Sequence, residues 1–299
     1  MRIKAKGDNY DDGRNDSFTG ALNAMVSMIK YSASQAYCMA VKIDQSISDK
    51  YINIEPTNNS SCYQIVDVQD VAEDMSLQPL FIQVHHNPKN RLPLQHLIDE
   101  AAGRTLGNVN LELTKNITVD LTDDDDIDLW RDKAGFVVRD NLYLCELTVN
   151  KSQFEKTLRI DTTVNISEFH DSQMQEILKF DKTLCFIDRS KYLQYLFKCT
   201  KVIVAENNDK LIMGYGIFEK DRILALYAND SGTAHAIVQK MLQLMDYTEV
   251  TFCTKKGCWS IEDQPETGLE KIKRLHTRTT SVNIVWEKIF ALNVGVNLI

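Results

Sequence analysis

The hydrophobic pattern of the first half of the chain alternates between helical and extended segments. Apolar residues from Phe18 to Ile29 recur at helical spacing and predict a helix, as do those in residues 92–106 and 127–134. Four consecutive aspartates at 123–126 precede the last of these helices, where carboxylates suit the positive end of the helix dipole. Strands are predicted at residues 36–43, 49–68 (two strands about a polar turn), 79–84, 108–121 and 136–149.

The second half repeats this kind of pattern after a less regular stretch, residues 151–171, which we interpret as a connector. Its clearest element is a hairpin over residues 201–220, in which two apolar strands flank a polar turn from Asn207 to Lys210. Both halves run through a similar order of elements, so we expect two units, residues 1–155 and 156–299. Further helices are predicted at residues 173–180, 188–199, 231–245 and 264–275, and further strands at 222–228, 249–254 and after residue 280.

Glycine and proline are scarce in this chain. The 299 residues contain 12 glycines and 5 prolines, where average usage would give roughly 21 and 15. Together with 43% hydrophobic and 25% charged residues, this composition excludes collagen-like and low-complexity classes and is typical of a globular protein. Because a backbone that wraps around phosphate groups usually needs several glycines in one short loop, the scarcity also limits where a phosphate site could form.

The charge balance argues against nucleic acids and anionic membranes as partners. The formal net charge is -8, from 34 Lys and Arg against 42 Asp and Glu, and no clustered basic face is recognisable. A nucleic-acid-binding or anionic-membrane surface would need such a face, so we expect neither partner. We interpret the basic residues Lys271, Lys273, Arg274 and Arg278 as a solvated helix face or salt-bridge partners, with a phosphate contact as the alternative. The N-terminal residues are polar and the chain has no run of 18 apolar residues, which predicts a soluble protein without a signal peptide or membrane span.

Cysteine usage indicates a reducing compartment. The seven cysteines form an odd and scattered set, which suits reduced thiols in the cytoplasm or nucleus better than a disulfide framework. Cys253 and Cys258 lie close together but lack a second pair, and His85, His86 and His96 lack a nearby carboxylate pattern. We therefore expect no metal site.

Several segments carry a resemblance to a known family. Residues 129–136, LWRDKAGF, are similar to the LYEKxGF signature that joins the last helix to the next strand in many GCN5-related N-acetyltransferase (GNAT) domains. The second half resembles the C-terminal acetyltransferase-like domain of YitH-type two-domain proteins. The most specific parts of that likeness are the strand with Gly214, Tyr215 and Gly216 and the turn LYAND at residues 226–230.

The resemblance implies a fold and a ligand. It implies an α+β chain of two tandem GNAT-like domains, each a mixed, mainly antiparallel, twisted sheet flanked by helices. It also implies that acetyl-CoA lies where two parallel strands splay, with its pyrophosphate on backbone N–H groups at a helix N-terminus. The residues that match this cofactor-binding stretch are Leu226, Tyr227, Ala228, Asn229, Asp230, Ser231, Gly232, Thr233 and Ala234.

Two interpretations of this stretch remain open. Gly232 and Ala234 fit a phosphate loop, whereas Asp230 would place a carboxylate near the phosphates unless it points outward as a helix cap. The alternative is a capped turn before a core helix. In the first half the matching residues 89–94 contain no glycine, so that half is expected to have lost the standard cofactor loop. The alternative is that Lys89 and Arg91 bind phosphate by their charge.

Acyl transfer to an amine also needs a base and an acid. The resemblance implies a tyrosine acid on the helix before the final strand, but in the first half Trp130 holds that position and its indole N–H cannot protonate a thiolate. In the second half the candidates are Tyr227, which either lines the cleft or packs in the core, and Glu219 at the end of the hairpin. No Ser-His-Asp arrangement is discernible from spacing.

Two hypotheses follow for the function. The first is an N-acyltransferase that moves an acetyl group from acetyl-CoA to an amine acceptor. The second is a non-catalytic protein that keeps the GNAT fold as a scaffold or ligand-binding unit. The missing glycines and Trp130 favour the second, whereas the stretch from Leu226 to Ala234 favours the first. The acceptor and the oligomeric state are not encoded in any recognisable motif.

Overall fold

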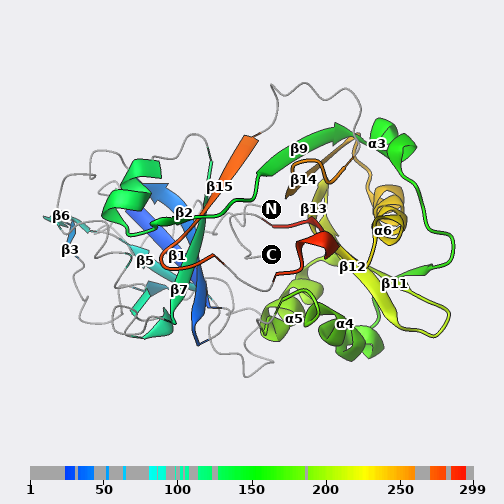
Figure 1. Cartoon of the computed structure of the whole chain (residues 1–299), viewed down its shortest axis with the longest axis horizontal. Helices are drawn as coiled ribbons and strands as arrows, with labels where there is room; N and C mark the ends of the chain where they lie inside the picture. Colours follow the sequence, from blue (N-terminus) through cyan, green and yellow to red (C-terminus); the bar gives the residue numbers. More distant parts are fainter. Residues whose placement is uncertain are drawn as a thin grey trace, which may run out of the picture.

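One long β-sheet runs through the computed structural model of the chain and carries helices on both faces (Figure 1). The structure describes residues 24–30, 33–43, 52–53, 63–64, 81–85, 87–91, 98, 102–103, 105–107, 114–122, 127–185, 188–259, 270–280 and 284–293. Within these residues the sheet has 14 strands, whose main path is β10-β11-β12-β13-β14-β9-β15-β7-β2-β1-β5-β4. The pairs β13–β14 and β2–β7 are parallel, whereas the other pairs in this sheet are antiparallel.

The first half supplies short strands and a π-helical turn. A separate small sheet joins β3 to β6. The elements are β1 (Ala24–Lys30), β2 (Gln35–Ile43), β3 (Ile52–Asn53), β4 (Tyr63–Gln64), β5 (Phe81–His85), β6 (Asn87–Arg91), β7 (Asn116–Leu121), the π-helix Leu129–Lys133, β8 (Val138–Arg139) and β9 (Leu144–Asn150).

The second half contains the longer helices. It begins with α3 (Lys151–Thr157), β10 (Asn165–Glu168), a 3-10 turn at Asp171–Gln173, α4 (Met174–Asp181) and α5 (Ser190–Cys199). It continues with β11 (Lys201–Glu206), β12 (Ile212–Glu219), β13 (Arg222–Ala228), α6 (Ser231–Leu244), β14 (Glu249–Lys255), β15 (Glu270–His276), a 3-10 turn at Trp286–Lys288 and β16 (Ile289–Ala291).

Two strands cross between the two parts of the sheet. β9, which ends the first half, pairs with β14. Leu144 lies opposite Lys255 at one end of this pairing, and Asn150 lies opposite Glu249 at the other. β15, from late in the chain, pairs first with β9 and then with β7, where Arg274 lies opposite Asp120. The two halves of the chain therefore share one continuous sheet instead of ending in separate edges.

The second half of the sheet lies between two helical layers. Its strands alternate, so that Tyr215 and Ile217 of β12 face α4 and α5, whereas Phe218 faces α6. Gly216 allows α6 to pack closely against β12, because a Cβ atom at this position would lie 2.0 Å from Met241 Cε. The predicted mixed, mainly antiparallel sheet flanked by helices is thus confirmed.

Several local predictions are confirmed and others are wrong. The hairpin at 201–220 and the helices at 173–180, 188–199 and 231–245 are present. The predicted helix at 18–29 is wrong where it is described, because Ala24–Lys30 form β1, which pairs with β2 on one side and β5 on the other. The connector at 151–171 contains α3 and β10.

The predicted helix at 264–275 is also wrong, since its described part is strand β15. Arg274 and His276 are buried in this strand, with relative exposures of 1% and 0%. Because these buried side chains are polar, the sequence of the strand lacks the usual alternation of apolar and polar residues. Their burial depends on hydrogen-bond partners that are distant in the sequence. The aspartates at 123–126 lie outside the described residues.

Candidate functional site

The parallel strands β13 and β14 separate shortly after they meet. They pair only at Arg222–Thr251 and Ile223–Phe252. Beyond these pairs, β13 pairs instead with β16, through Leu226–Ala291 and Tyr227–Ile289. On the other side of the gap the Leu292 amide donates to the carbonyl oxygen of Cys253 in β14, at 3.0 Å. The space between the diverging strands is therefore filled by a C-terminal segment of the chain itself, drawn in red beside β13 in Figure 1.

Side chains of β14 and the residues that follow it hold this inserted segment. The carbonyl oxygen of Phe290 accepts hydrogen bonds from Thr254 Oγ1 at 2.8 Å and from Trp259 Nε1 at 3.0 Å. Lys255 Nζ donates to the carbonyl oxygen of Trp286. Ile289, Ala291 and Leu292 have relative exposures of 1%, 0% and 1%, so the segment is part of the core.

The N-terminus of α6 follows β13 directly and is capped by Asp230. One carboxylate oxygen of Asp230 accepts from the Thr233 amide at 2.8 Å, and the other accepts from Thr233 Oγ1 at 2.9 Å. The Asp230 side chain therefore supplies the negative charge that favours a helix N-terminus. This is the capped arrangement that the sequence left open as an alternative to a phosphate loop.

A second carboxylate residue lies over the same turn. The Asp161 amide donates to the carbonyl oxygen of Gly232 at 3.2 Å, and a Cβ atom on Gly232 would lie 3.1 Å from Asp161 Cβ. Hydrogen bonds from Thr163 lower the pKa of Asp161, which keeps this carboxyl ionised. Two anionic side chains next to Gly232 oppose the binding of phosphate there.

His235 attaches the segment that contains Arg159 and Asp161 to α6. Its Nδ1 accepts a hydrogen bond from the Arg159 amide at 2.7 Å, and its ring stacks on Trp259 with centroids 5.2 Å apart. Burial lowers the pKa of His235, and a neutral ring with its proton on Nε2 fits the acceptor role of Nδ1. His235 thus fixes the connection and is not free to act as a base.

Tyr227 points into a buried polar cluster on the opposite face of the sheet. Its hydroxyl accepts from Arg189 Nη1 at 3.3 Å, and Arg189 is paired with Asp181. Tyr215 donates to the same carboxylate of Asp181 at 2.5 Å. Burial raises the pKa of Tyr227, whose exposure is 0%, so this hydroxyl does not reach solvent.

Glu219 lies far from that cluster. It pairs with Arg222 at the start of β13, whereas Tyr227 and Asp230 lie at or beyond the end of this strand. A strand rises by about 3.3 Å per residue, which puts roughly 20 Å of strand between the two ends. The structure therefore does not bring Glu219 and Tyr227 into one site.

A polar cluster that sequence reasoning missed lies near the point where β13 and β14 separate. Glu146 of β9 is paired with Arg222 and lies 3.5 Å from Cys253 Sγ. Burial would raise the pKa of Glu146, but the hydrogen bond and charge of Arg222 outweigh it and hold the pKa below its usual range. The side chains of Glu146 and Arg222 keep exposures of 27% and 22%, so both reach solvent.

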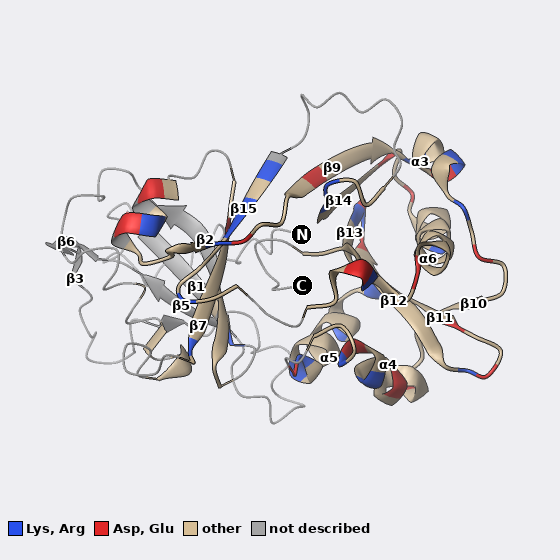
Figure 2. Cartoon of the chain, viewed as in Figure 1, with Lys and Arg blue, Asp and Glu red and all other residues tan. Residues whose placement is uncertain are grey.

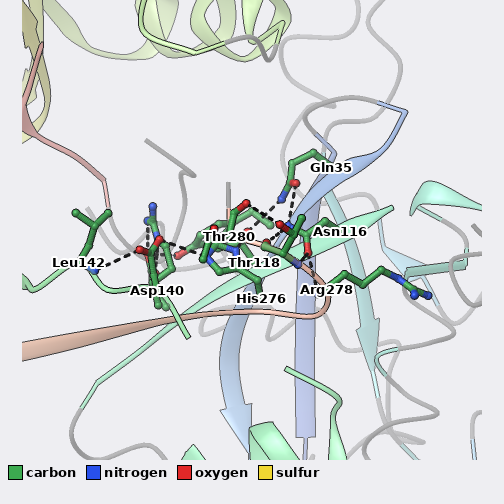
Figure 3. Close-up of polar contacts among 12 residues, drawn as sticks. Gln35, Asn116, Thr118, Asp140, Leu142, His276, Arg278 and Thr280 are labelled. Atoms are coloured by element: carbon green, nitrogen blue, oxygen red, sulfur yellow. Dashed lines mark hydrogen bonds and ion pairs between the residues drawn. The ribbon is translucent and has the colours of Figure 1, made fainter. Parts of the chain in front are cut away.

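A relay of hydrogen bonds crosses the first part of the sheet (Figure 3). Gln35 Nε2 donates to Thr118 Oγ1 at 3.1 Å, and Thr118 Oγ1 lies 2.8 Å from His276 Nδ1. The tautomer of the His276 ring decides which of these two atoms donates. His276 Nε2 then faces Asp140 Oδ2 at 3.3 Å.

This relay has the order of a hydroxyl–imidazole–carboxylate triad, but it is closed to substrate. Thr118 and His276 both have 0% exposure. The relay joins β2, β7 and β15, and its neighbour Asn116 donates to Gln35 Oε1 at 3.2 Å (Figure 3). We therefore assign a structural role to this relay, which joins the two parts of the sheet.

The first half shows no matching cofactor loop where it is described. Residues 89–91, expected in that loop, belong to β6, and the parallel neighbour of β7 is β2 rather than the strand that precedes β6. Residues 92–94 lie outside the described residues. Trp130, at the expected acid position, has 1% exposure and packs edge-on against Phe136.

Two features are absent from the part of the chain that the structure describes. No group of three or more His, Cys, Asp or Glu side chains is placed to hold a metal ion in the part of the chain that the structure describes. None of the helices described is both long and apolar enough to cross a membrane. Acidic and basic residues are mixed along α3 and α4, whereas the charged residues of α5 are lysines and β15 carries blue bands (Figure 2).

Comparisons with known proteins place this geometry among known folds. Residues 13–138 match a family model described only as a domain of unknown function, DUF7596. No curated protein matches the chain.

Solved structures are more informative about the fold. An acetyltransferase candidate from Pyrococcus horikoshii superposes with a TM-score of 0.54 at 12% identity, covering 92% of this chain and 76% of that one. A GCN5-related N-acetyltransferase from Sphaerobacter thermophilus reaches a TM-score of 0.45 at 9% identity, covering 92% of this chain and 80% of that one. The chain thus shares the fold of the Pyrococcus horikoshii structure at low sequence identity.

Proposed function

We propose that the chain is an acyl-CoA-dependent N-acyltransferase, with acetyl-CoA as its acyl donor and an amine as its acceptor. The observation that carries this proposal is the separation of β13 from β14 immediately before the N-terminus of α6. The residues proposed to line the donor site are those from Leu226 to Ala234. A division into two GNAT-like units, residues 1–155 and 156–299, in a cytoplasmic or nuclear protein belongs to the same proposal.

The conformation described does not fit the donor. β16 fills the gap between the strands, and Asp230 caps the N-terminus of α6, where a pyrophosphate would need free N–H partners. The Asp161 backbone and Cβ atom lie over the same turn. Acyl-CoA binding therefore requires at least a rearrangement of β16.

The Glu146 side chain is the described carboxylate best placed to receive a proton from an amine. It reaches solvent beside the point of strand separation, and it comes from β9 rather than from the second half. Its pairing with Arg222 keeps it ionised, which a proton acceptor requires.

Titration of acetyl-CoA against the wild type and Gly232→Glu tests the donor site. Gly103→Glu is the matched control, because it makes the same change of charge where a Cβ atom meets nothing within 4 Å. Loss of binding by Gly232→Glu alone would support the proposal. Equal binding by both variants would reject it. Absence of binding by the wild type and by Thr254→Val combined with Trp259→Phe, which removes two hydrogen bonds that hold β16, would also reject it.

A second candidate function is a non-catalytic scaffold with the GNAT fold. It is favoured by one specific observation, the occupation of the strand gap by buried β16. A turnover assay with a panel of amines separates the two functions, since release of free CoA that Gly232→Glu abolishes requires an enzyme. Binding of acetyl-CoA without release from any amine would favour the scaffold.

A further inference from the structure

We propose that β16 is a displaceable strand that closes the acyl-CoA slot, so that the chain inhibits its own donor site until β16 leaves. This inference rests on the proposed function, because a slot must exist for β16 to close it. The occupant of the slot is identified directly: it is residues 289–292 of the same chain, antiparallel to both walls.

The attachment of β16 is short compared with the pairing of the strands around it. β16 contributes two residue pairs to β13 and one bridge to β14. By contrast, β14 pairs with β9 over seven residues, and β13 pairs with β12 through Gly214–Ala228 and Glu219–Arg222 at its two ends. Release of β16 thus leaves both walls of the slot paired on their outer sides.

Two side-chain hydrogen bonds that hold β16 end on one carbonyl group. The carbonyl oxygen of Phe290 takes the hydrogen bonds of both Thr254 and Trp259. When β16 leaves, the backbone groups of β13 near Leu226 and Tyr227 lose their partners and become available to an extended ligand. The amide-bearing arm of coenzyme A can supply the missing hydrogen bonds, which makes exchange of strand for ligand chemically balanced.

A reversible crosslink tests whether β16 must move. Leu292 and Cys253 are antiparallel bridge partners, and such partners lie about 4.5–5.5 Å apart at Cα, within the range that a disulfide spans. In Leu292→Cys, oxidation is expected to join residue 292 to Cys253, with loss of two hydrogens detected by mass spectrometry. Acetyl-CoA binding should disappear on oxidation and return on reduction, whereas the wild type should not respond to the same oxidant.

Loosening β16 should have the opposite effect. Thr254→Val and Trp259→Phe each remove one donor to Phe290 and keep most of the side-chain volume. A higher population of the open form lowers the apparent dissociation constant in proportion, so we expect acetyl-CoA to bind about tenfold tighter in the double variant. Thr157→Val is the matched control, because Thr157 Oγ1 donates to the Phe154 carbonyl at 2.8 Å in α3 and should not alter binding.

Hydrogen exchange provides a readout that does not depend on affinity. The Leu292 amide, which donates to Cys253, should exchange faster when acetyl-CoA is bound. Thermal unfolding of each variant checks that it folds. If the confirmed crosslink leaves binding unchanged, or if the double variant binds no tighter than the wild type, the inference is wrong. If neither the reduced crosslink variant nor the loosened variants bind acetyl-CoA, the proposed function itself is wrong.

Discussion

Replacing Arg274 by methionine should remove a large part of the stability of this protein. Arg274 in β15 and Asp120 in β7 are joined by two hydrogen bonds of 2.7 Å, and both side chains have 0% exposure. Tyr37 donates to the same carboxylate at 2.8 Å. Without Arg274 the Asp120 charge stays in a dry site with the Tyr37 hydroxyl as its remaining described hydrogen-bond donor.

The expected cost is large because a buried charge would lose its counter-ion. Removal of one partner of a buried ion pair typically destabilises a protein by about 3–5 kcal/mol, against a total stability of roughly 5–15 kcal/mol. Replacing both residues, in Asp120→Leu with Arg274→Met, removes both charges. The double variant should therefore lie within about 2 kcal/mol of the wild type, with a strong coupling between the two positions.

Urea unfolding at pH 7 measures these free energies. Arg131→Met is the control, since Arg131 pairs with Asp132 at side-chain exposures of 51% and 54% and should cost less than about 1 kcal/mol. A cost below about 1 kcal/mol for Arg274→Met would refute the assignment of a buried ion pair. Additive losses in the double variant would show that the two side chains do not depend on each other.

Two further predictions concern α6. Gly216→Ala should destabilise the protein by about 1–3 kcal/mol in urea unfolding, because its Cβ atom would lie 2.0 Å from Met241 Cε, whereas Gly103→Ala, with nothing within 4 Å, should be neutral or stabilising. Burial lowers the pKa of His235, so its contribution to stability is fully present above about pH 6.5 and is lost as the pH falls from there toward the folded pKa. His235→Phe should flatten this dependence between pH 7 and 5 in thermal unfolding, and an unchanged dependence would show that another group causes it.

The elements that could be predicted from sequence are those whose burial follows a simple local period. The hairpin of β11 and β12 alternates around the turn at Asn207, and α6 shows a regular helical stripe, so both were predicted correctly. β15 was not, because Arg274 and His276 are polar residues in buried positions. Their partners Asp120 and Thr118 are more than 150 positions away in sequence, at separations of 154 and 158, and no local pattern reports such contacts.

Prediction of the candidate site from sequence is limited in the same way by contacts between residues that are distant in the chain. The stretch from Leu226 to Ala234 could be proposed from sequence because its residues are contiguous, and it runs from the end of β13 into the first turn of α6. Glu146 was missed because its neighbour Cys253 is 107 residues away. β-rich character was predicted for the segment after residue 280, but its insertion between two parallel strands depends on tertiary pairing that a hydrophobic pattern does not encode.

The shared sheet determines how the gap between β13 and β14 can open. β14 is fixed along its length by β9, which is itself tied to β15 and through β15 to β7 in the other part of the sheet. Moving β14 away from β13 would therefore strain a chain of paired strands that ends at the buried Arg274–Asp120 pair. β16 has no such support, since its described ladder contacts are those with β13 and the single bridge at Leu292. Release of β16 would leave the ladder from β14 through β9 and β15 to β7 intact, which favours β16 as the part that moves.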